Sequence, residues 1–101
     1  MSALLLGIYM ANNLHITYDL ITPGQDYTAV IEKIKSLGAW AKVTESFWYV
    51  QSDLTASQAR DQIKLVLDPN DKLYVVDSTN GAAAWNGLSK VVSDFILDKW
   101  S

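Results

Sequence analysis

The sequence contains no cysteine and a single histidine, His15. Without cysteine the chain cannot form disulfide bonds, use a thiol nucleophile or bind a metal through thiolates. One histidine also excludes a cage of several histidines within one chain. Basic residues are few, 8 against 11 acidic ones for a net charge of −3, and none precedes Lys33. This balance argues against strong binding of long nucleic acid, which depends on neutralising many phosphates.

Half of the 101 residues are hydrophobic, whereas disordered chains are short of such residues. A chain of this length folds around one core of two packed layers. We therefore expect a single domain over residues 1–101, with an apolar arm at 1–12, a core at 14–80 and a C-terminal helix at 82–100.

The apolar run at residues 3–11 is about half as long as a membrane span, and no basic residue precedes it as in a signal peptide. One alternative is an arm or extra strand that packs on the domain or on a partner chain. The other is a segment that lies upstream of the true translation start, which would be Met10. Both alternatives predict a cytoplasmic protein.

Hydropathy patterns predict the order β-α-β-β-α-β followed by a helix. Thr55 with Gln58 three residues later is typical of a capping box, and Gly38 is typical of a helix end. The expected elements are a strand at Leu14–Ile21, a helical stripe from Tyr27 to Leu37, a hairpin of Ala39–Thr44 and Phe47–Ser52, a helix opening at Thr55, a strand at Lys72–Asp77 and a helix at 83–100.

This order predicts an α+β protein of the ferredoxin-like class, with a four-stranded antiparallel sheet and both crossover helices on one face. Alternation turns one set of the first strand toward the helices: Leu14, Ile16, Tyr18 and Leu20. His15, Thr17 and Asp19 lie on the other face. They are joined there by one of two alternating sets of the third strand, either the Phe47 set (Phe47, Tyr49 and Gln51) or the Trp48 set (Trp48, Val50 and Ser52). Either set is too apolar to remain exposed to solvent, so a second copy of the sheet or the C-terminal helix should cover it. We expect a homodimer.

Two motifs carry a resemblance to a known family. Tyr18-Asp19-Leu20 ends the first strand, and Ser46-Phe47-Trp48-Tyr49-Val50 lies in the hairpin; the segment Pro23–Tyr27 reads Pro-Gly-Gln-Asp-Tyr. Over Leu14–Asn80 the chain resembles the SinR-like proteins of bacteria and phages and their relatives, the small CRISPR adaptation-subunit proteins and the VapD-type ribonucleases. The resemblance implies a ferredoxin-like fold in a family that handles nucleotides.

In the nuclease branches of that family, the aspartate that matches Asp19 is implicated in binding a divalent metal across the dimer axis. A pair of such carboxylates would suit Mg²⁺ or Mn²⁺. This sequence departs from the pattern, because Leu20 and Ile21 stand where basic residues usually follow. From the residues alone, Asp19 either caps the next turn or contacts a ligand or metal.

Aromatic and polar side chains supply the candidate ligand contacts. Trp48 and Tyr49 are adjacent on a strand and so point to opposite faces. Arg60 either binds a phosphate or pairs with Asp61 or Glu32. We expect Trp40 or Trp48 to stack on a base, and phosphate or base edges to be contacted by Lys42, Ser46, Arg60 and Asn80.

The first functional hypothesis is a non-enzymatic, nucleotide-binding homodimer in the cytoplasm, with no cofactor. Some small phage proteins of comparable size act as sponges for cyclic nucleotide signals of host defence. By that analogy, this chain would be a phage anti-defence sponge in the host cytoplasm. The alternatives are an endoribonuclease or endonuclease that uses Asp19 with Mg²⁺ or Mn²⁺, and a protein-interaction module.

Overall fold

The computed structural model describes residues 11–20, 27–79, 81 and 83–100. The apolar arm, apart from its last two residues, and Asn80 therefore lie outside the described residues. The elements run in the order β1 (Asn12–Asp19), α1 (Tyr27–Lys35), β2 (Gly38–Thr44), β3 (Phe47–Ser52), α2 (Ala56–Lys64), β4 (Lys72–Asp77) and α3 (Lys90–Lys99).

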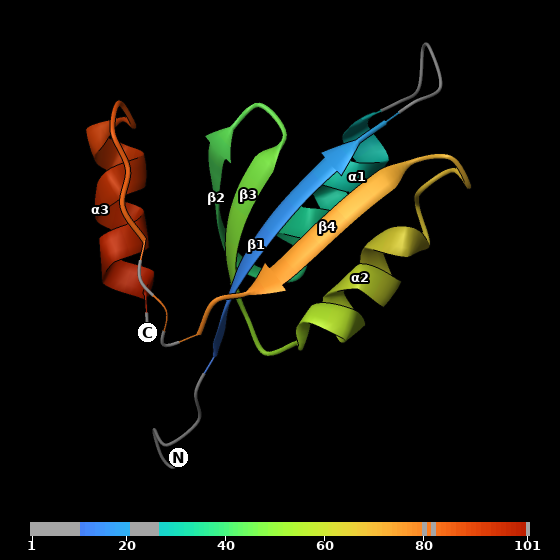
Figure 1. Cartoon of the computed structure of the whole chain (residues 1–101), viewed down its shortest axis with the longest axis horizontal. Helices are drawn as coiled ribbons and strands as arrows, with labels where there is room; N and C mark the ends of the chain where they lie inside the picture. The colour runs from blue at the N-terminus through green and yellow to red at the C-terminus, as the bar shows by residue number, and fades with distance from the viewer. Residues whose placement is uncertain (1–10, 21–26, 80, 82, 101) are drawn as a thin grey trace.

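The four strands form one antiparallel sheet in the order β2-β3-β1-β4. Helices α1 and α2 lie together on one face of it, and α3 stands apart from them, beside β2 (Figure 1). This is the predicted α+β, ferredoxin-like arrangement with an added C-terminal helix.

The core lies between the sheet and the pair α1–α2. The predicted inward set of β1 is buried there, against Trp48 and Val50 of β3. Helix α1 contributes Val30 and Ile34, and α2 contributes Ala59 and Ile63, each at the helical spacing that places two side chains on one face. Removing that apolar surface from water provides the main driving force for this packing.

The predicted capping box and the predicted hairpin are both present. The Thr55 hydroxyl accepts from the Gln58 backbone N–H at 3.1 Å, and the Gln58 side chain accepts from the Thr55 N–H at 2.9 Å, which completes the capping box of α2. The hairpin turns between Thr44 and Phe47. Gly38, expected only as a helix end, opens β2 where a Cβ would lie 1.9 Å from the Gln51 carbonyl oxygen, so the strands approach too closely for a side chain.

Three elements show the main differences from the predicted boundaries. Strand β1 spans Asn12–Asp19 instead of Leu14–Ile21. Helix α2 ends at Lys64, although Val66 and Leu67 continue the apolar spacing of Ala59 and Ile63. These two residues follow in turns with i to i+3 hydrogen bonds. Helix α3 begins at Lys90 instead of residue 82 or 83, because Gly87 has a positive φ of 83° and the Ser89 hydroxyl caps the Val92 N–H.

The register decides which set of β3 shares the face of His15. His15 pairs with Tyr49 and Thr17 with Phe47, so the Phe47 set lies on this face and the Trp48 set lies in the core. The segment from Ala83 through α3 to Trp100 covers the half of this face over β2 and β3. On the β1–β4 half, Tyr74 remains 67% exposed opposite Thr17. The C-terminal helix thus supplies part of the predicted cover.

Among the described helices, none has the length and apolar character required to cross a membrane.

Candidate functional site

A surface pocket of about 390 Å³, which we name the tyrosine notch, gathers several of the candidate residues. It lies where the end of β1, the start of α1 and the β2–β3 turn meet. Its lining residues are Tyr18, Asp19, Leu20, Tyr27, Ile31, Lys42, Glu45 and Ser46. Two predicted ligand contacts, Lys42 and Ser46, and the alternative metal residue Asp19 therefore line one pocket.

Two tyrosine rings form the aromatic part of the notch. The centroids of Tyr18 and Tyr27 lie 6.3 Å apart with their planes tilted by 46°. Tyr18 is buried because it points to the helices from β1, whereas Tyr27 begins α1 and is 50% exposed. The Tyr27 ring is thus held beside a fixed neighbour and still offers surface to a ligand.

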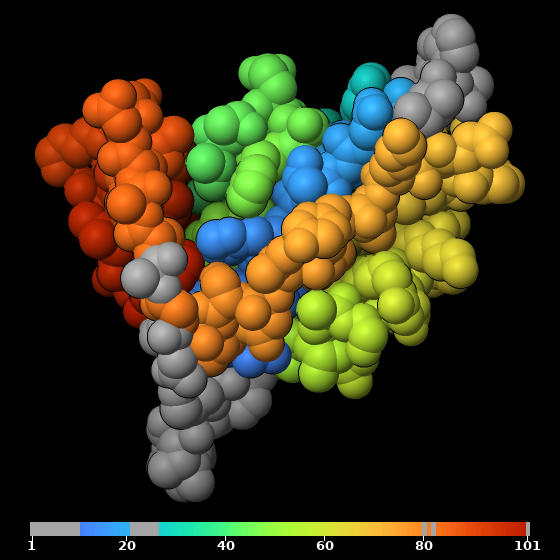
Figure 2. Space-filling view, viewed as in Figure 1, coloured from blue at the N-terminus to red at the C-terminus, as the bar shows by residue number. Residues whose placement is uncertain are grey.

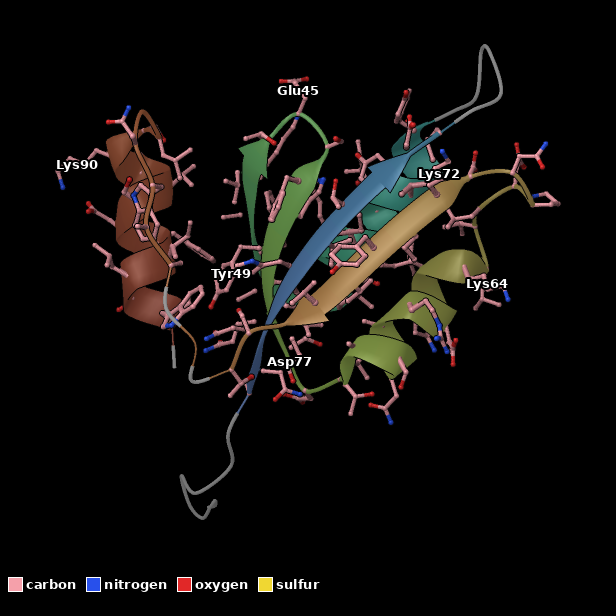
Figure 3. The ribbon with its side chains drawn as sticks, viewed as in Figure 1. Glu45, Tyr49, Lys64, Lys72, Asp77 and Lys90 are labelled. Carbon is pink, nitrogen blue, oxygen red and sulfur yellow. The ribbon has the colours of Figure 1, made fainter. Side chains whose placement is uncertain are left out.

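One ammonium and two carboxylates carry the charge of the notch. Lys42 Nζ lies 3.8 Å from Glu45 Oε1, and both side chains are exposed. Figure 3 shows Glu45 at the tip of the β2–β3 turn. Such solvent-exposed pairs add little stability, so the Lys42 ammonium can leave Glu45 and bind the anionic group of a ligand instead. Asp19 is exposed at the end of β1, in register with Lys72 of β4.

The two tryptophans predicted to stack on a base lie outside the notch. Trp48 is buried in the core at 2% exposure, and its ring contacts Trp40 edge to face at a centroid distance of 5.5 Å. The Trp48 indole N–H is buried and has no hydrogen-bond partner among the described residues. Trp40 keeps 39% exposure beneath the Lys35 ammonium, which is 4.5 Å from its ring centroid.

Arg60 lies on α2, away from the notch. Of the alternatives considered for Arg60, the structure shows the ion pair with Asp61: Arg60 Nη2 and Nε donate to the same carboxylate oxygen at 2.8 and 3.0 Å. The same side chain lines two shallow hollows between α2 and β4. Arg60 therefore does not join Lys42 and Ser46 in one site.

A second hollow, which we name the α3 cavity, lies between the His15 face of the sheet and the segment that leads into α3. Its volume is about 150 Å³. Figure 2 shows the cover of the cavity, α3 and its preceding segment in orange and red, beside the green strands. The aromatic members of the lining are His15, Phe47, Tyr49, Trp85 and Trp100, and the aliphatic members include Val43, Leu88 and Ile96.

His15 stands among these rings, with centroid distances of 5.6 Å to Phe47, 6.1 Å to Tyr49 and 5.6 Å to Trp100. Burial lowers the pKa of His15 below its ordinary value of 6.5, because the charged imidazolium loses hydration there. Its Nε2 lies 3.4 Å from Ser78 Oγ. The neutral imidazole is thus favoured in the folded protein.

Tyr49 points from β3 toward α3 (Figure 3). Its hydroxyl donates to Asn13 Oδ1 at 2.8 Å, and burial raises the pKa of Tyr49 to about 12. Trp100 stacks on the Tyr49 ring, and its indole N–H donates to the Gly81 carbonyl at 3.2 Å. Gln51 Nε2 also donates to the Lys99 carbonyl at 3.0 Å. These contacts attach the C-terminal helix to the sheet.

Sequence reasoning missed the tyrosines of the notch and the rings of the α3 cavity. Tyr18 and Tyr27 were placed among the apolar, inward-facing residues of their elements. A tyrosine at the end of an element is often amphipathic, with a buried ring and a solvent-exposed hydroxyl, which was a signal for such a site. The high number of aromatic residues, four tryptophans and five tyrosines, was the available signal for the cavity. It could not say which of them gather.

Within the described ranges, no group of three or more histidine, aspartate or glutamate side chains is placed to hold a metal ion. Comparisons of the chain with protein-family models, with curated proteins and with solved structures gave no match.

Proposed function

We propose that the protein is a non-enzymatic, nucleotide-binding homodimer and that the tyrosine notch is its binding site. The observation that carries this proposal is the meeting of Lys42, Ser46 and Asp19 beside two tyrosine rings in one pocket. These residues come from three separate segments of the chain. Their side chains are the types that contact phosphate, hydroxyl groups and base edges, next to rings on which a base can stack.

The base would lie against the exposed surface of Tyr27. Stacking on an aromatic side chain contributes about 1–3 kcal/mol per base and tolerates any base, since every base has a π-face. Tyr18, packed 6.3 Å from Tyr27, limits how far the Tyr27 ring can turn. A ring restricted before binding loses less conformational entropy when the ligand arrives.

The phosphate would lie at Lys42, near the Ser46 hydroxyl. Glu45 is the ion-pair partner of Lys42, and its side chain is fully exposed. When the Lys42 ammonium leaves Glu45 to bind a phosphate, water can therefore hydrate the freed Glu45 carboxylate. The carboxylate of Asp19 on the same lining can accept hydrogen bonds from ribose hydroxyls or a base amine. One ammonium per notch suits a ligand with one phosphate per nucleotide.

The volume supports one nucleotide in each subunit. Small-molecule sites measure about 300–1,000 Å³, and the notch, at about 390 Å³, is near the lower end. A cyclic dinucleotide presents two such units related by a two-fold axis. A two-fold homodimer with one notch in each subunit would match that symmetry, which favours a sponge for a cyclic dinucleotide signal of host defence, encoded by a phage.

Binding without turnover is also the simpler chemistry for this notch. The one histidine of the chain lines the α3 cavity on the other face of the sheet and is not part of the notch. A general base of pKa near neutrality, which proton transfer at pH 7 favours, is therefore not supplied by histidine here.

Calorimetry with a panel of cyclic dinucleotides, cyclic trinucleotides and mononucleotides tests the proposal. Lys42→Ala should weaken binding by roughly 10- to 150-fold, the loss expected for a charged hydrogen bond. Lys90→Ala is the matched control. Lys90 also forms an exposed ion pair with a nearby carboxylate, that of Asp94, but it lies on α3 and does not line the notch. The ligand should be recovered intact.

Two results would overturn the proposal. One is that no member of the panel binds more tightly than about 10 μM. The other is that Lys90→Ala weakens binding as much as Lys42→Ala, because the loss would then report net charge and not the notch.

A further inference from the structure

We propose that the α3 cavity is a second, separate binding site, which takes a small neutral aromatic molecule with one polar group at most, of the class of indole or phenol. None of the described residues lines both the cavity and the tyrosine notch. The cavity therefore extends the function beyond the nucleotide site.

The size of the cavity limits the ligand to one small aromatic molecule. An apolar cavity of about 150 Å³ is the size known to stay dry and to hold one benzene molecule, and the α3 cavity measures about 150 Å³. A nucleotide, with its sugar and phosphate, needs more than twice that space. Because the cavity opens at one side between the sheet and α3, a second fused ring can extend toward solvent.

The chemistry of the lining excludes ions. Among the residues that the structure describes, no lysine, arginine, aspartate or glutamate lines the cavity. A phosphate, carboxylate or ammonium that entered it would lose hydration and find no charged partner, which costs several kcal/mol. Among the lining residues His15 can ionise near neutrality, and its surroundings favour the neutral form.

The polar atoms of the rings are already engaged, which limits the hydrogen bonds that a ligand could make. Tyr49 donates to Asn13, Trp85 Nε1 donates to Ser93 Oγ at 3.0 Å, and Trp100 Nε1 donates to the Gly81 carbonyl. His15 has one contact, the long 3.4 Å approach to Ser78 Oγ, and no other hydrogen bond among the described residues. A ligand with one hydroxyl or one N–H can use His15, whereas a base would leave several polar atoms unpaired, each at a cost.

The arrangement of the rings favours another ring over a quaternary ammonium ion. Such a cation is recognised by several aromatic faces turned toward it. Here Tyr49 and Trp100 turn a face toward each other, with planes 20° from parallel, and His15 meets Phe47 and Tyr49 edge to face. Edge-to-face and offset contacts of this kind are the ones that a further aromatic ring extends.

Titration of the full chain with indole, followed by NMR, tests this proposal, with indole-3-acetate and tetramethylammonium as charged comparison probes. We expect saturable binding of one indole with a dissociation constant of about 1 mM or lower. The indole should shift the methyl signals of Ala83 and Ala84 and the indole N–H signal of Trp85, which all line the cavity. The two charged probes should bind at least about tenfold more weakly.

Leu88→Phe, which adds volume to the lining, should weaken indole binding at least about tenfold. Leu97→Phe is the matched control, because Leu97 is 67% exposed on α3 and does not line the cavity. It should leave indole binding unchanged. Should Leu88→Phe not fold, the position of the indole-induced shifts in the unmodified chain decides the question.

The proposal is overturned if indole does not saturate the protein, or if its shifts map away from residues 83–100 and β3. It is also overturned if tetramethylammonium binds more tightly than indole, which would make the cavity a cation cage. Equal affinities of Leu88→Phe and Leu97→Phe for indole would be equally decisive against it.

Discussion

Trp100 stacks on Tyr49, with ring centroids 5.8 Å apart and planes 20° from parallel. This contact joins the residue that follows the last helix to the middle of the third strand, and both rings line the α3 cavity. The C-terminal helix makes few other polar contacts with the sheet, the chief one being the hydrogen bond from Gln51 to the Lys99 carbonyl. The stacked pair and this hydrogen bond both hold the C-terminal end of α3 against the sheet.

Trp100→Ala should release α3 from the sheet. A stacked aromatic pair contributes about 0.5–1.5 kcal/mol beyond the area that it buries. We expect the amide hydrogens of α3 to exchange faster by a factor of ten or more, while the protection of β1 and β3 stays unchanged. This is possible because the free energy of local opening can be smaller than that of global unfolding. Val91→Ala, a substitution at a 78% exposed position of α3, is the control. Uniformly faster exchange across the whole sheet would contradict this prediction.

Stability should fall on mild acidification because of His15. In the unfolded chain His15 takes up a proton at its ordinary pKa of 6.5, but in the folded protein burial lowers that pKa. The unfolded state therefore binds more protons between the two values, and the free energy of unfolding falls as the pH drops through 6.5 toward the folded pKa. Above about pH 7 this contribution is complete.

Denaturant unfolding at about pH 7.5 and about pH 5.5 measures this loss. His15→Phe should remove most of it, since a benzene ring of similar size does not titrate. If His15→Phe shows the same decrease as the original chain, other groups cause it.

Trp48→Phe should be tolerated far better than Trp48→Ala. The Trp48 ring is 2% exposed, and its indole N–H is buried without a partner among the described residues. An unsatisfied buried donor costs about 1–3 kcal/mol, and phenylalanine removes this cost while keeping a ring in the core. We expect a loss of about 3–5 kcal/mol for alanine and about 1 kcal/mol or less for phenylalanine, from urea unfolding. A loss for phenylalanine close to that for alanine would contradict this prediction.

Asp19→Asn separates the binding proposal from the nuclease alternative. The Asp19 carboxylate lines the same notch as Lys42 and would repel a phosphate there. An asparagine amide oxygen can still accept the hydrogen bonds proposed for that carboxylate, so the substitution removes the charge and keeps the acceptor. Removing its charge should strengthen nucleotide binding about threefold at low salt. We expect neither protein to cut RNA or DNA with Mg²⁺ or Mn²⁺. Metal-dependent cutting by the original chain that is lost in Asp19→Asn would make the nuclease the leading function.

Tyr74 offers a test of the homodimer. It is 67% exposed on the half of the sheet that α3 does not cover, opposite Thr17. We expect the protein to sediment at twice its chain mass of 11.2 kDa, and Tyr74→Lys to shift it toward the monomer. Leu65→Lys, at a position 74% exposed after α2, should leave the dimer intact. A monomer at micromolar concentration in the original chain would refute the homodimer and the two-fold ligand model with it.

Local sequence patterns predicted most of the fold. The alternation in β1 and the capping box at Thr55 depend on contacts within a few residues, so they can be read without knowing the rest of the molecule. The last helix was predicted too long, because Trp85 and Leu88 follow helical spacing but line the α3 cavity from a segment that is not helical. Periodicity alone does not distinguish these two ways of burying an apolar side chain.

The candidate site was predicted only in part. Lys42 and Ser46 do line one pocket, since a hairpin brings the two ends of its turn together. Arg60 was grouped with them by charge alone and lies on α2 instead. No sequence pattern links the start of α1 to the β2–β3 turn, so the contribution of Tyr27 was not foreseen.

The amino-acid sequence by itself determined the class of the fold, the absence of thiol chemistry and a strand whose two faces differ in polarity. Those properties follow from composition and from periods of two and 3.6 residues. The tertiary structure decided which face of β3 joins His15, because a shift of one residue in register would exchange Trp48 for Tyr49. It also decided that the C-terminal helix covers half of that face and leaves a cavity beneath it. Both depend on contacts between residues more than 30 positions apart, which local patterns do not encode.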